Sequence, residues 1–298
     1  MALVPLMNCQ GATKSCVFET SRGSFNLSRF FVEALKIYVD TPSLALWRAI
    51  EARALAPVSF SPPVLDLACG TGHFARMLLG NMVITGCDLD ENAVRIAAKE
   101  KTLDALSVAD ARALPYPDCA FNSVLANCAL EHIHDVGQVM AEVARVLKPM
   151  GVLAFTVPSE HFNDLLFFPR LYQFLGLHSR ARRHIQWYNS LQQHYHMDPL
   201  SVWVNRLKTA GFKLILHRYY MPMFSTLIFS LWDVMAKWTI PLRRNRSIRI
   251  QQFLLDWVPN RILFWILYYH LIRYYRSLPN ADSGSGLLVV ARKEVDRC

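Results

Sequence analysis

The chain has 298 residues, of which 53% are hydrophobic and 18% are charged, so its composition is that of a globular protein and excludes a disordered one. The net charge of +9 is unevenly spread: residues 180–276 carry 15 Lys and Arg against three acids, whereas the rest of the chain is slightly acidic. This basic part of the chain is also rich in aromatic residues. We therefore expect it to meet something anionic.

The N-terminus has no basic segment followed by a sustained apolar run, so it does not resemble a secretory signal. The seven cysteines form no Cys-x-x-Cys pair, which argues against a disulfide framework and against a zinc site. Two apolar stretches, residues 223–240 and 261–275, fall short of the ~20 uninterrupted apolar residues of a membrane span. We expect a cytoplasmic protein with reduced thiols, no transmembrane helix and, as an option, peripheral contact with a membrane.

Helical spacing of apolar residues over 24–55, interrupted at Thr41-Pro42, predicts two helices ahead of the main domain. Strands and helices then alternate, which predicts a mostly parallel sheet covered by helices on both faces. The predicted strands are 64–68, 83–88, 106–109, 123–127 and 152–157, and the helices between them are 74–79, 91–99 and 136–147. Mixed helical segments follow Pro158, and two late strands are predicted at 212–220 and 287–292.

This pattern divides the chain into four parts: a tail with cap helices (1–60), an α/β core (61–220), an apolar and basic helical insertion (221–285), and a final core strand with a tail (286–298). The insertion holds two short aromatic-rich apolar segments separated by the basic run RRNRSIR. Such a composition is typical of helices that lie on anionic membrane surfaces. Three roles for the insertion stay open: a lid, a contact with an anionic membrane surface, or a homodimer interface.

The segment VLDLACGTGHFAR, residues 64–76, runs from a strand through a glycine-bearing turn into a helix. Gly70, Gly72 and Ala75 fit the loose G-x-G-x-x-A pattern of dinucleotide-binding turns, and Asp88 follows at the end of the next strand. On this evidence alone a dinucleotide would be an acceptable ligand.

Two further acids argue against a dinucleotide. Asp66 lies inside the first strand, where it would repel a pyrophosphate and would attract a ligand ammonium group. Asp110 lies at the carboxyl end of the third strand, at the edge where open α/β sheets bind ligands, and it can accept a hydrogen bond from an exocyclic amine.

Four successive segments resemble the motifs of class I S-adenosylmethionine-dependent methyltransferases, in particular the small-molecule branch that includes quinone-biosynthesis methyltransferases. The segments are VLDLACGTG (64–72), ITGCDLDENAVRIA (84–97), VADARALPYPDCAFNSVLANCALEHIHD (108–135) and EVARVLKPMGVLAFTVPSE (142–160). The resemblance covers about residues 64–158 and, more weakly, the final strand GLLVVARK. It implies a Rossmann-like, mostly parallel seven-stranded sheet with an N-terminal helical cap and a helical insertion, and S-adenosylmethionine as cofactor.

The resemblance also implies which residues contact the cofactor. They are Asp66, Ala68, Cys69, Gly70 and Gly72 for the methionine part, Asp88 and Leu89 for the ribose and adenine, Asp110 and Ala111 for the adenine edge, and Asn127 and Leu130 below the sulfonium. The chain departs from the family at two turns: Asn122 stands where an aspartate is usual, and Met150 stands where a glycine is usual. Both departures put the geometry of a turn in question rather than a cofactor contact.

Methyl transfer from a sulfonium requires positioning and, for a protonated acceptor, a base. His132 and His161 follow the fourth and fifth core strands and are the first candidates for this base; Tyr195 and His196 come after them.

No metal site is expected from the sequence. His194 and His196 are two residues apart and do not share a helix face, and no carboxylate has ligand spacing with them or with His184.

The sequence favours an enzyme that methylates a small, apolar or lipid-like acceptor, with a membrane surface as a further partner. Two alternatives stay open: a nucleic-acid methyltransferase whose basic region follows phosphates, and a non-catalytic cofactor-binding protein. A nucleic-acid partner is disfavoured, because Asn127 is followed by Cys-Ala-Leu and not by the Pro-Pro-aromatic sequence of enzymes that methylate base amino groups.

Overall fold

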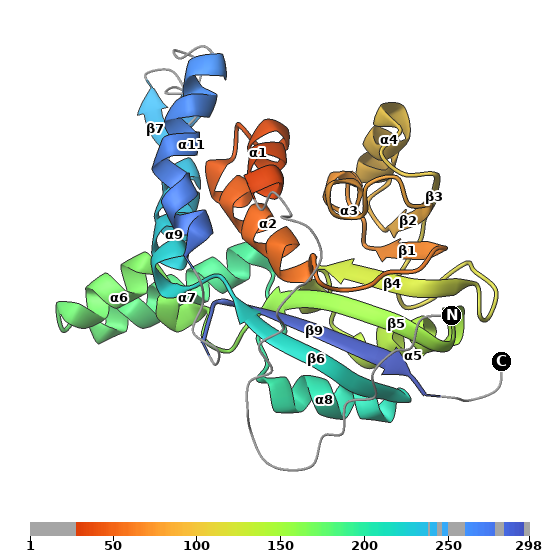
Figure 1. Ribbon diagram of the computed structural model, residues 1–298. Coiled ribbons are helices and arrows are strands. Elements are labelled where there is room, and N and C mark those ends of the chain that lie inside the picture. Colours follow the sequence, from red (N-terminus) through yellow and green to blue (C-terminus); the bar gives the residue numbers. More distant parts are fainter. Residues whose placement is uncertain (1–27, 238, 243–245, 250–259, 278–282, 295–298) are drawn as a thin grey trace.

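The computed structural model describes residues 28–237, 239–242, 246–249, 260–277 and 283–294, and it contains a seven-stranded sheet between helices (Figure 1). The strand order is β3-β2-β1-β4-β5-β9-β6; the first five run parallel, and β9 is antiparallel to both of its neighbours. The strands are β1 (Val64–Leu67), β2 (Ile84–Asp88), β3 (Ala105–Val108), β4 (Phe121–Asn127), β5 (Leu147–Pro158), β6 (Phe212–Tyr220) and β9 (Gly286–Lys293). The predicted α/β fold is confirmed.

Helices cover both faces of the sheet, so two hydrophobic cores form. One core includes residues of α1 (Ser28–Ile37), α2 (Pro42–Leu55), α3 (His73–Leu79), α9 (Met223–Lys237) and α11 (Asn260–Arg276). The other includes residues of α5 (Val136–Val146) and α8 (Leu200–Thr209). Among the described residues, the other helical elements are α4 (Glu91–Glu100), η1 (Leu130–His132), η2 (Asn163–Leu165), α6 (Phe167–Phe174) and α7 (His178–Gln192).

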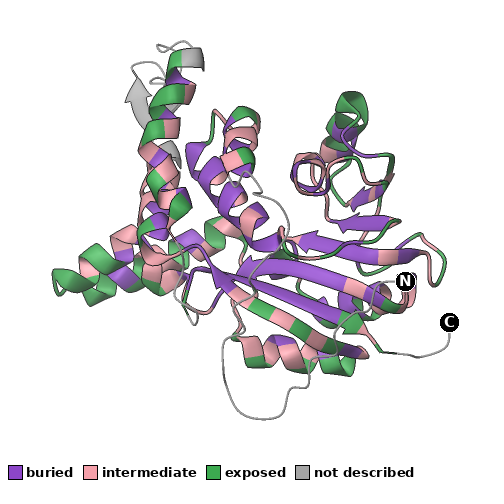
Figure 2. Ribbon diagram, in the orientation of Figure 1, coloured by how far each residue is buried: buried purple, intermediate pink, exposed green. Residues whose placement is uncertain are grey.

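The final strand β9 contributes side chains to both hydrophobic cores. Leu287, Val289 and Ala291 belong to the core under α5 and α8, and Leu288 and Val290 belong to the core under α2. Successive side chains of a strand point to opposite faces of the sheet, so a strand that is covered on both faces has to be apolar throughout. Figure 2 shows β9 and its neighbour β5 as mostly buried.

The insertion between β6 and β9 packs against the N-terminal cap helices. Trp47 of α2 lies 4.9 Å from Phe229 of α9, and Phe31 of α1 stacks on Tyr275 of α11 at 5.1 Å, measured between ring centroids. Besides α9 and α11, the described residues of the insertion include a two-stranded antiparallel sheet of β7 (Thr239–Leu242) and β8 (Arg246–Arg249), which the sequence did not predict. Within the described residues, every helix falls short of the length and apolarity needed to cross a bilayer.

The two departures from the family motifs lie at the irregular start of the β4–β5 pairing. Asn122 donates from its backbone to Pro63 and from its side chain to Pro62, and so fixes the approach to β1. Met150 has a φ of 63°, in the left-handed region that favours glycine, which explains why glycine is usual at this position.

The expectation of reduced thiols holds for Cys69, Cys87 and Cys128 but is wrong for Cys119, which is disulfide-bonded.

Candidate functional site

The loop after β1 is built from residues in unusual backbone conformations. Ala68, Gly70 and Gly72 all have positive φ, with values of 55°, 54° and 74°. A Cβ atom at position 72 would lie 2.6 Å from Thr102 Oγ1 and 2.7 Å from Leu103 Cγ, so only glycine fits there. The loop therefore turns tightly at the carboxyl end of β1, close to where α3 begins.

Asp66 lies in the middle of β1 and is only 3% exposed. Its carboxyl group forms no hydrogen bond with another described residue. Burial and, to a smaller extent, the nearby Asp88 raise the pKa of Asp66 to about 8, although Arg48 opposes the rise. A buried carboxyl group of this kind is suited to receive a cation, because a bound ammonium would restore its charged form.

Asp88 ends β2 and holds the loop in place. Its Oδ2 accepts a hydrogen bond from the Gly70 backbone at 2.7 Å, and its Oδ1 accepts one from the Asp90 backbone at 2.8 Å. Leu89, the next residue, is 69% exposed beside this carboxylate. The carboxylate thus links the glycine loop to the start of α4, and the neighbouring leucine offers an open apolar surface.

Asp110 follows β3 and is paired with Arg112. The carboxylate accepts hydrogen bonds of 2.6–3.1 Å from the Arg112 guanidinium group and one of 2.9 Å from its backbone nitrogen. These bonds lower the pKa of Asp110. A ligand amine at this edge would have to share the carboxylate with Arg112.

A pocket of about 720 Å³ opens where these strands end. Its lining consists of Ala68, Asp88, Leu89, Asp90, Ala109, Asp110, Ala111, Arg112, Cys128, Ala129, His132, Ile133, His134 and Gln193. The structure thus brings together Ala68, Asp88, Leu89, Asp110 and Ala111 from the set that the sequence predicted. The other predicted cofactor residues, Asp66, Cys69, Gly70, Gly72, Asn127 and Leu130, do not line this pocket.

Asn127, at the end of β4, belongs to a buried polar network that the sequence did not reveal. Its Oδ1 accepts a hydrogen bond of 2.6 Å from Arg48 of α2, and Arg48 also pairs with Glu51 at 2.7 Å. Burial alone would raise the pKa of Glu51, but Arg48 holds it below its ordinary value. Glu51 also accepts a hydrogen bond of 2.8 Å from the Tyr220 hydroxyl. The sequence signal that could have indicated this network is the pair Arg48 and Glu51 in an otherwise apolar stretch of α2.

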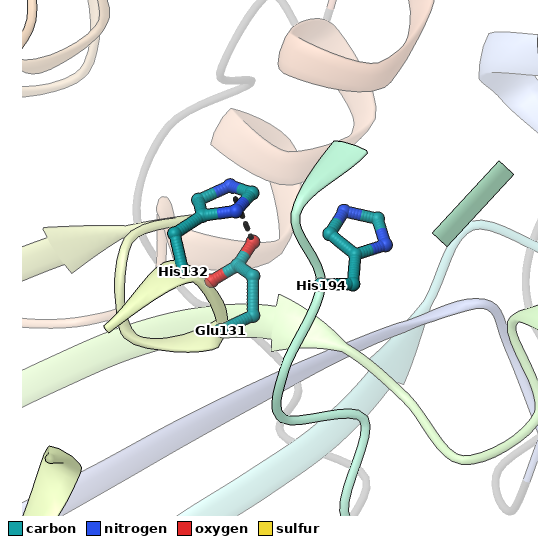
Figure 3. Close-up of side chains that lie close together, drawn as sticks. All are labelled: Glu131, His132 and His194. Atoms are coloured by element: carbon teal, nitrogen blue, oxygen red, sulfur yellow. Dashed lines mark ion pairs between the residues drawn. The ribbon is translucent and has the colours of Figure 1, made fainter. Parts of the chain in front are cut away.

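His132 lies on the pocket wall with its ring fixed by the chain. Its Nδ1 is 3.2 Å from the Gln193 carbonyl oxygen, and burial lowers its pKa. The neighbouring Glu131 is buried, and burial raises its pKa to about 8. Figure 3 shows these two side chains together with His194, which comes from the segment after α7.

The other candidate bases do not line the pocket. His161 lies 3.9 Å from Glu160 and packs beside Tyr219, and the His196 ring contacts backbone carbonyl oxygens at 3.0 and 3.2 Å. The Tyr195 ring packs on His134 at 3.7 Å between ring centroids. The assignment of a base to any of these four residues, His132, His161, Tyr195 or His196, stays a prediction.

Comparison with known proteins adds to this geometry. A family model described as a methyltransferase domain matches residues 65–155. A demethylmenaquinone methyltransferase of Listeria monocytogenes is 35% identical over 118 residues, which cover 36% of this chain and 49% of that protein. One of Clavibacter sepedonicus is 27% identical over 220 residues, which cover 67% of this chain and 87% of that protein. The matching segment spans about half the length of the relatives that are 35% identical to this chain.

Among solved structures, Haemonchus contortus phosphoethanolamine N-methyltransferase 2 in complex with S-adenosyl-L-methionine is similar, with a TM-score of 0.52 and 18% sequence identity. The match covers 83% of this chain and 52% of that one. At this identity the likeness shows the fold alone.

Proposed function

We propose that this chain, whose residues 65–155 form a methyltransferase domain of the S-adenosylmethionine-dependent class, transfers a methyl group from S-adenosylmethionine to a small apolar or lipid-like acceptor. The observation that carries the proposal is the row of three carboxylates, Asp66, Asp88 and Asp110, at neighbouring strands around the glycine loop.

Each carboxylate suits a different part of the cofactor. The buried Asp66 would pair with the ammonium group of the methionine part, which is the charge that its environment lacks. Asp88 would accept hydrogen bonds from the ribose hydroxyls while it holds Gly70, and the exposed Leu89 would pack on the adenine ring. A volume of about 720 Å³ is in the range of small-molecule pockets.

The cofactor supplies an activated methyl group when it is bound. The chain's task is then to hold the acceptor in line and to keep water away from the reacting atoms. Ala129 and Ile133 give the far wall an apolar character, and His132 presents a ring nitrogen there. This wall is therefore the proposed place for the acceptor.

Helix α11 supports an acceptor that is reached at a membrane surface. Its solvent-facing side carries Ile262, Trp265, Ile266 and Tyr269, whose side chains are 54–71% exposed. The positions follow the i, i+3, i+4, i+7 spacing of a single helix face. A solvated helix normally presents polar groups on that face, so an exposed apolar stripe of this kind indicates a partner.

The same face of α11 continues into basic residues. Arg273 and Arg276 are exposed, lie one and two turns beyond Tyr269, and have no acidic residue near them on the helix. Apolar and aromatic residues next to arginines are typical of helices that lie in the headgroup region of anionic bilayers.

The turn between α6 and α7 offers a second apolar surface. Phe174 is 87% exposed and Leu175 56% exposed, and exposed arginines follow at Arg180, Arg182 and Arg183. From this turn α7 leads to Gln193 at the pocket wall, about 22 Å away for 15 helical residues. This surface would bring a membrane-bound acceptor towards the pocket.

Vesicle flotation tests the membrane part of the proposal. The full chain should float with anionic vesicles and less with neutral ones, and the double variant Trp265→Ser, Ile266→Ser should float much less. The variant Val83→Ser, Ile96→Ser, which removes exposed apolar side chains elsewhere, is the matched control and should float like the parent. Equal flotation of both variants, or a dimer that α11 substitutions dissociate without any vesicle binding, would contradict a membrane contact.

Transfer of labelled methyl groups from S-adenosylmethionine to a cellular lipid extract, compared with transfer to total RNA, tests the acceptor class. We expect label in the lipid fraction. Label confined to RNA would favour the nucleic-acid alternative, which the comparisons do not favour, and label in neither fraction would favour a non-catalytic protein or a water-soluble acceptor.

A further inference from the structure

Three side chains that commonly bind metal ions meet beside the pocket, and one of them, His132, lines it. A carboxylate oxygen of Glu131 and one ring nitrogen each of His132 and His194 all lie within 4.8 Å of one another (Figure 3). Glu131 and His132 belong to η1, whereas His194 follows α7, so about sixty residues of sequence separate the two parts. This separation explains why residue spacing gave no sign of the cluster.

The His132 ring is oriented as a metal ligand requires. Its Nδ1 lies 3.2 Å from the Gln193 carbonyl oxygen and donates to it, which leaves Nε2 with a free lone pair 3.8 Å from Glu131 Oε1. Histidines that bind metals usually donate their second ring nitrogen in this way. Two ligands at about 2.1 Å from a tetrahedral Zn²⁺ ion are about 3.4 Å apart, so the observed separation needs only a small adjustment.

Glu131 lacks a full partner for its charge. The residue is 1% exposed, its Oε2 is buried without a hydrogen bond, and its only ion pair among the described residues is the one with His132. A buried carboxylate is costly unless a cation or several donors compensate for its lost hydration. The nearest guanidinium of the buried network, Arg48, is paired with Glu51 instead.

The backbone holds the two parts of the cluster together. The Glu131 carbonyl oxygen accepts hydrogen bonds from the Tyr195 backbone at 2.8 Å and from the His196 backbone at 3.3 Å, and the His196 ring reaches back to Ile133 at 3.0 Å. These bonds clamp the segment that carries His194 onto η1. The cluster is therefore formed by the fold itself, as a preorganised site requires.

We propose that Glu131, His132 and His194 bind a divalent transition-metal ion, for which Zn²⁺ is the probe. Two imidazoles and one carboxylate form a typical three-ligand set for such ions, and imidazole ligands disfavour Mg²⁺ and Ca²⁺. Because His132 lines the pocket, the remaining coordination positions would face the proposed acceptor wall. An acceptor oxygen would complete the coordination there, after its proton is released to solvent.

This proposal revises the role that the sequence suggested for His132. A metal-bound Nε2 has no lone pair left, so His132 would be a ligand and not a base. The metal site also goes beyond the proposed methyl transfer, because Zn²⁺ binding can be measured on the folded chain without S-adenosylmethionine.

The test is a titration of the purified full chain with Zn²⁺ against a chromophoric chelator, with Co²⁺ absorption as a second readout. We expect one site per chain, and at least about tenfold weaker binding in each of Glu131→Gln, His132→Gln and His194→Gln. Glu100→Gln and His217→Gln are the matched controls, because these side chains lie outside the cluster, and they should bind like the parent. Circular dichroism of each variant checks that it is folded.

A parent chain that binds neither ion would overturn the metal site, and so would folded Glu131→Gln and His194→Gln variants with parental affinity. Titration of the same proteins with S-adenosylmethionine separates this outcome from the proposed function. A parent chain that binds Zn²⁺ but not S-adenosylmethionine would contradict the proposed methyl transfer and support the metal site. A parent chain that binds S-adenosylmethionine but not Zn²⁺ would contradict the metal site and leave the proposed methyl transfer intact.

Discussion

The loop after β1 and the exposed face of α11 are specified in different ways. In the loop, glycines, positive φ values and a hydrogen bond to the Asp88 carboxylate constrain the backbone closely. On α11, four apolar side chains and two arginines share a surface without any hydrogen-bonding pattern. Few sequences can form such a loop, whereas many sequences can form an apolar and basic helix face. The loop is therefore recognised from the sequence, while the face of α11 is recognised only when the structure shows which of its residues are exposed.

The sharpest way to break the loop is Gly72→Ala. The new Cβ would clash with Thr102 and Leu103 at a φ of 74°, so we expect a loss of about 2–4 kcal/mol in the free energy of unfolding. Urea denaturation measures this loss. Gly137→Ala is the control, since the nearest atom to its Cβ is 3.7 Å away, and it should leave stability unchanged or slightly higher. Equal stability of both variants would show that the loop is not constrained as described.

Asp88→Ala tests the carboxylate that both holds the loop and is proposed to bind the ribose. It removes charge-assisted hydrogen bonds to the loop and to the ribose, which together correspond to about 1.5–3 kcal/mol, or more than tenfold in the Kd for S-adenosylmethionine. Isothermal titration gives the Kd directly. Asp118→Ala, at an exposed carboxylate away from the pocket, should bind the cofactor like the parent. An unchanged Kd in Asp88→Ala would sink the assignment of this carboxylate.

The double variant Arg273→Gln, Arg276→Gln probes the opposite region. Each arginine near an anionic surface corresponds to about 1 kcal/mol, so binding to anionic vesicles should weaken by an order of magnitude or more. The Kd for S-adenosylmethionine should stay the same, because α11 does not line the pocket. If the variant bound both anionic vesicles and S-adenosylmethionine more weakly, α11 and the loop after β1 would not be independent.

Asp66 makes cofactor binding depend on pH. Its pKa of about 8 lies above the ordinary value of 3.8, so below pH 8 the free chain holds a proton that a bound ammonium would expel. The affinity should therefore rise with pH, by about tenfold per unit, until pH 8. Titrations between pH 6 and 8 in buffers of different ionisation enthalpy detect both the trend and the released proton. In Asp66→Asn the affinity should be weak and nearly independent of pH; a flat profile in the parent would contradict the role of Asp66.

The smallest effect is expected at Met150, in the irregular first part of β5. Met150→Gly relieves a left-handed φ at a half-exposed position, and after the entropy cost of glycine we expect a gain of about 0.5–1 kcal/mol in unfolding free energy. Met150→Ala keeps the Cβ and should give no such gain. Thermal unfolding of the two variants side by side resolves the difference.

Much of the fold was predictable because strands that are buried on both faces leave continuous apolar runs, as in β5 and β9. The carboxylates were also predictable, since Asp88 and Asp110 stand at or just after a strand end and Asp66 interrupts the apolar run of β1. Contacts between distant segments were not. Arg48 of α2 reaches Asn127 of β4 across the sheet edge, and no local pattern reports that approach.

The cluster of Glu131 and His194 escaped prediction for the same reason. The two residues meet only because the segment after α7 folds back onto η1 through backbone hydrogen bonds. The β7–β8 hairpin escaped for a different reason, because a short basic run carries no period that distinguishes a strand from a loop.

Titration of the full chain with S-adenosylmethionine is the most direct test of the central claim that the loop after β1 holds this cofactor. The structure predicts saturable binding at one site per chain, weakened in Asp66→Asn and Asp88→Ala and preserved in Asp118→Ala. A folded chain that shows no such binding, or that binds equally well in all three variants, would contradict it.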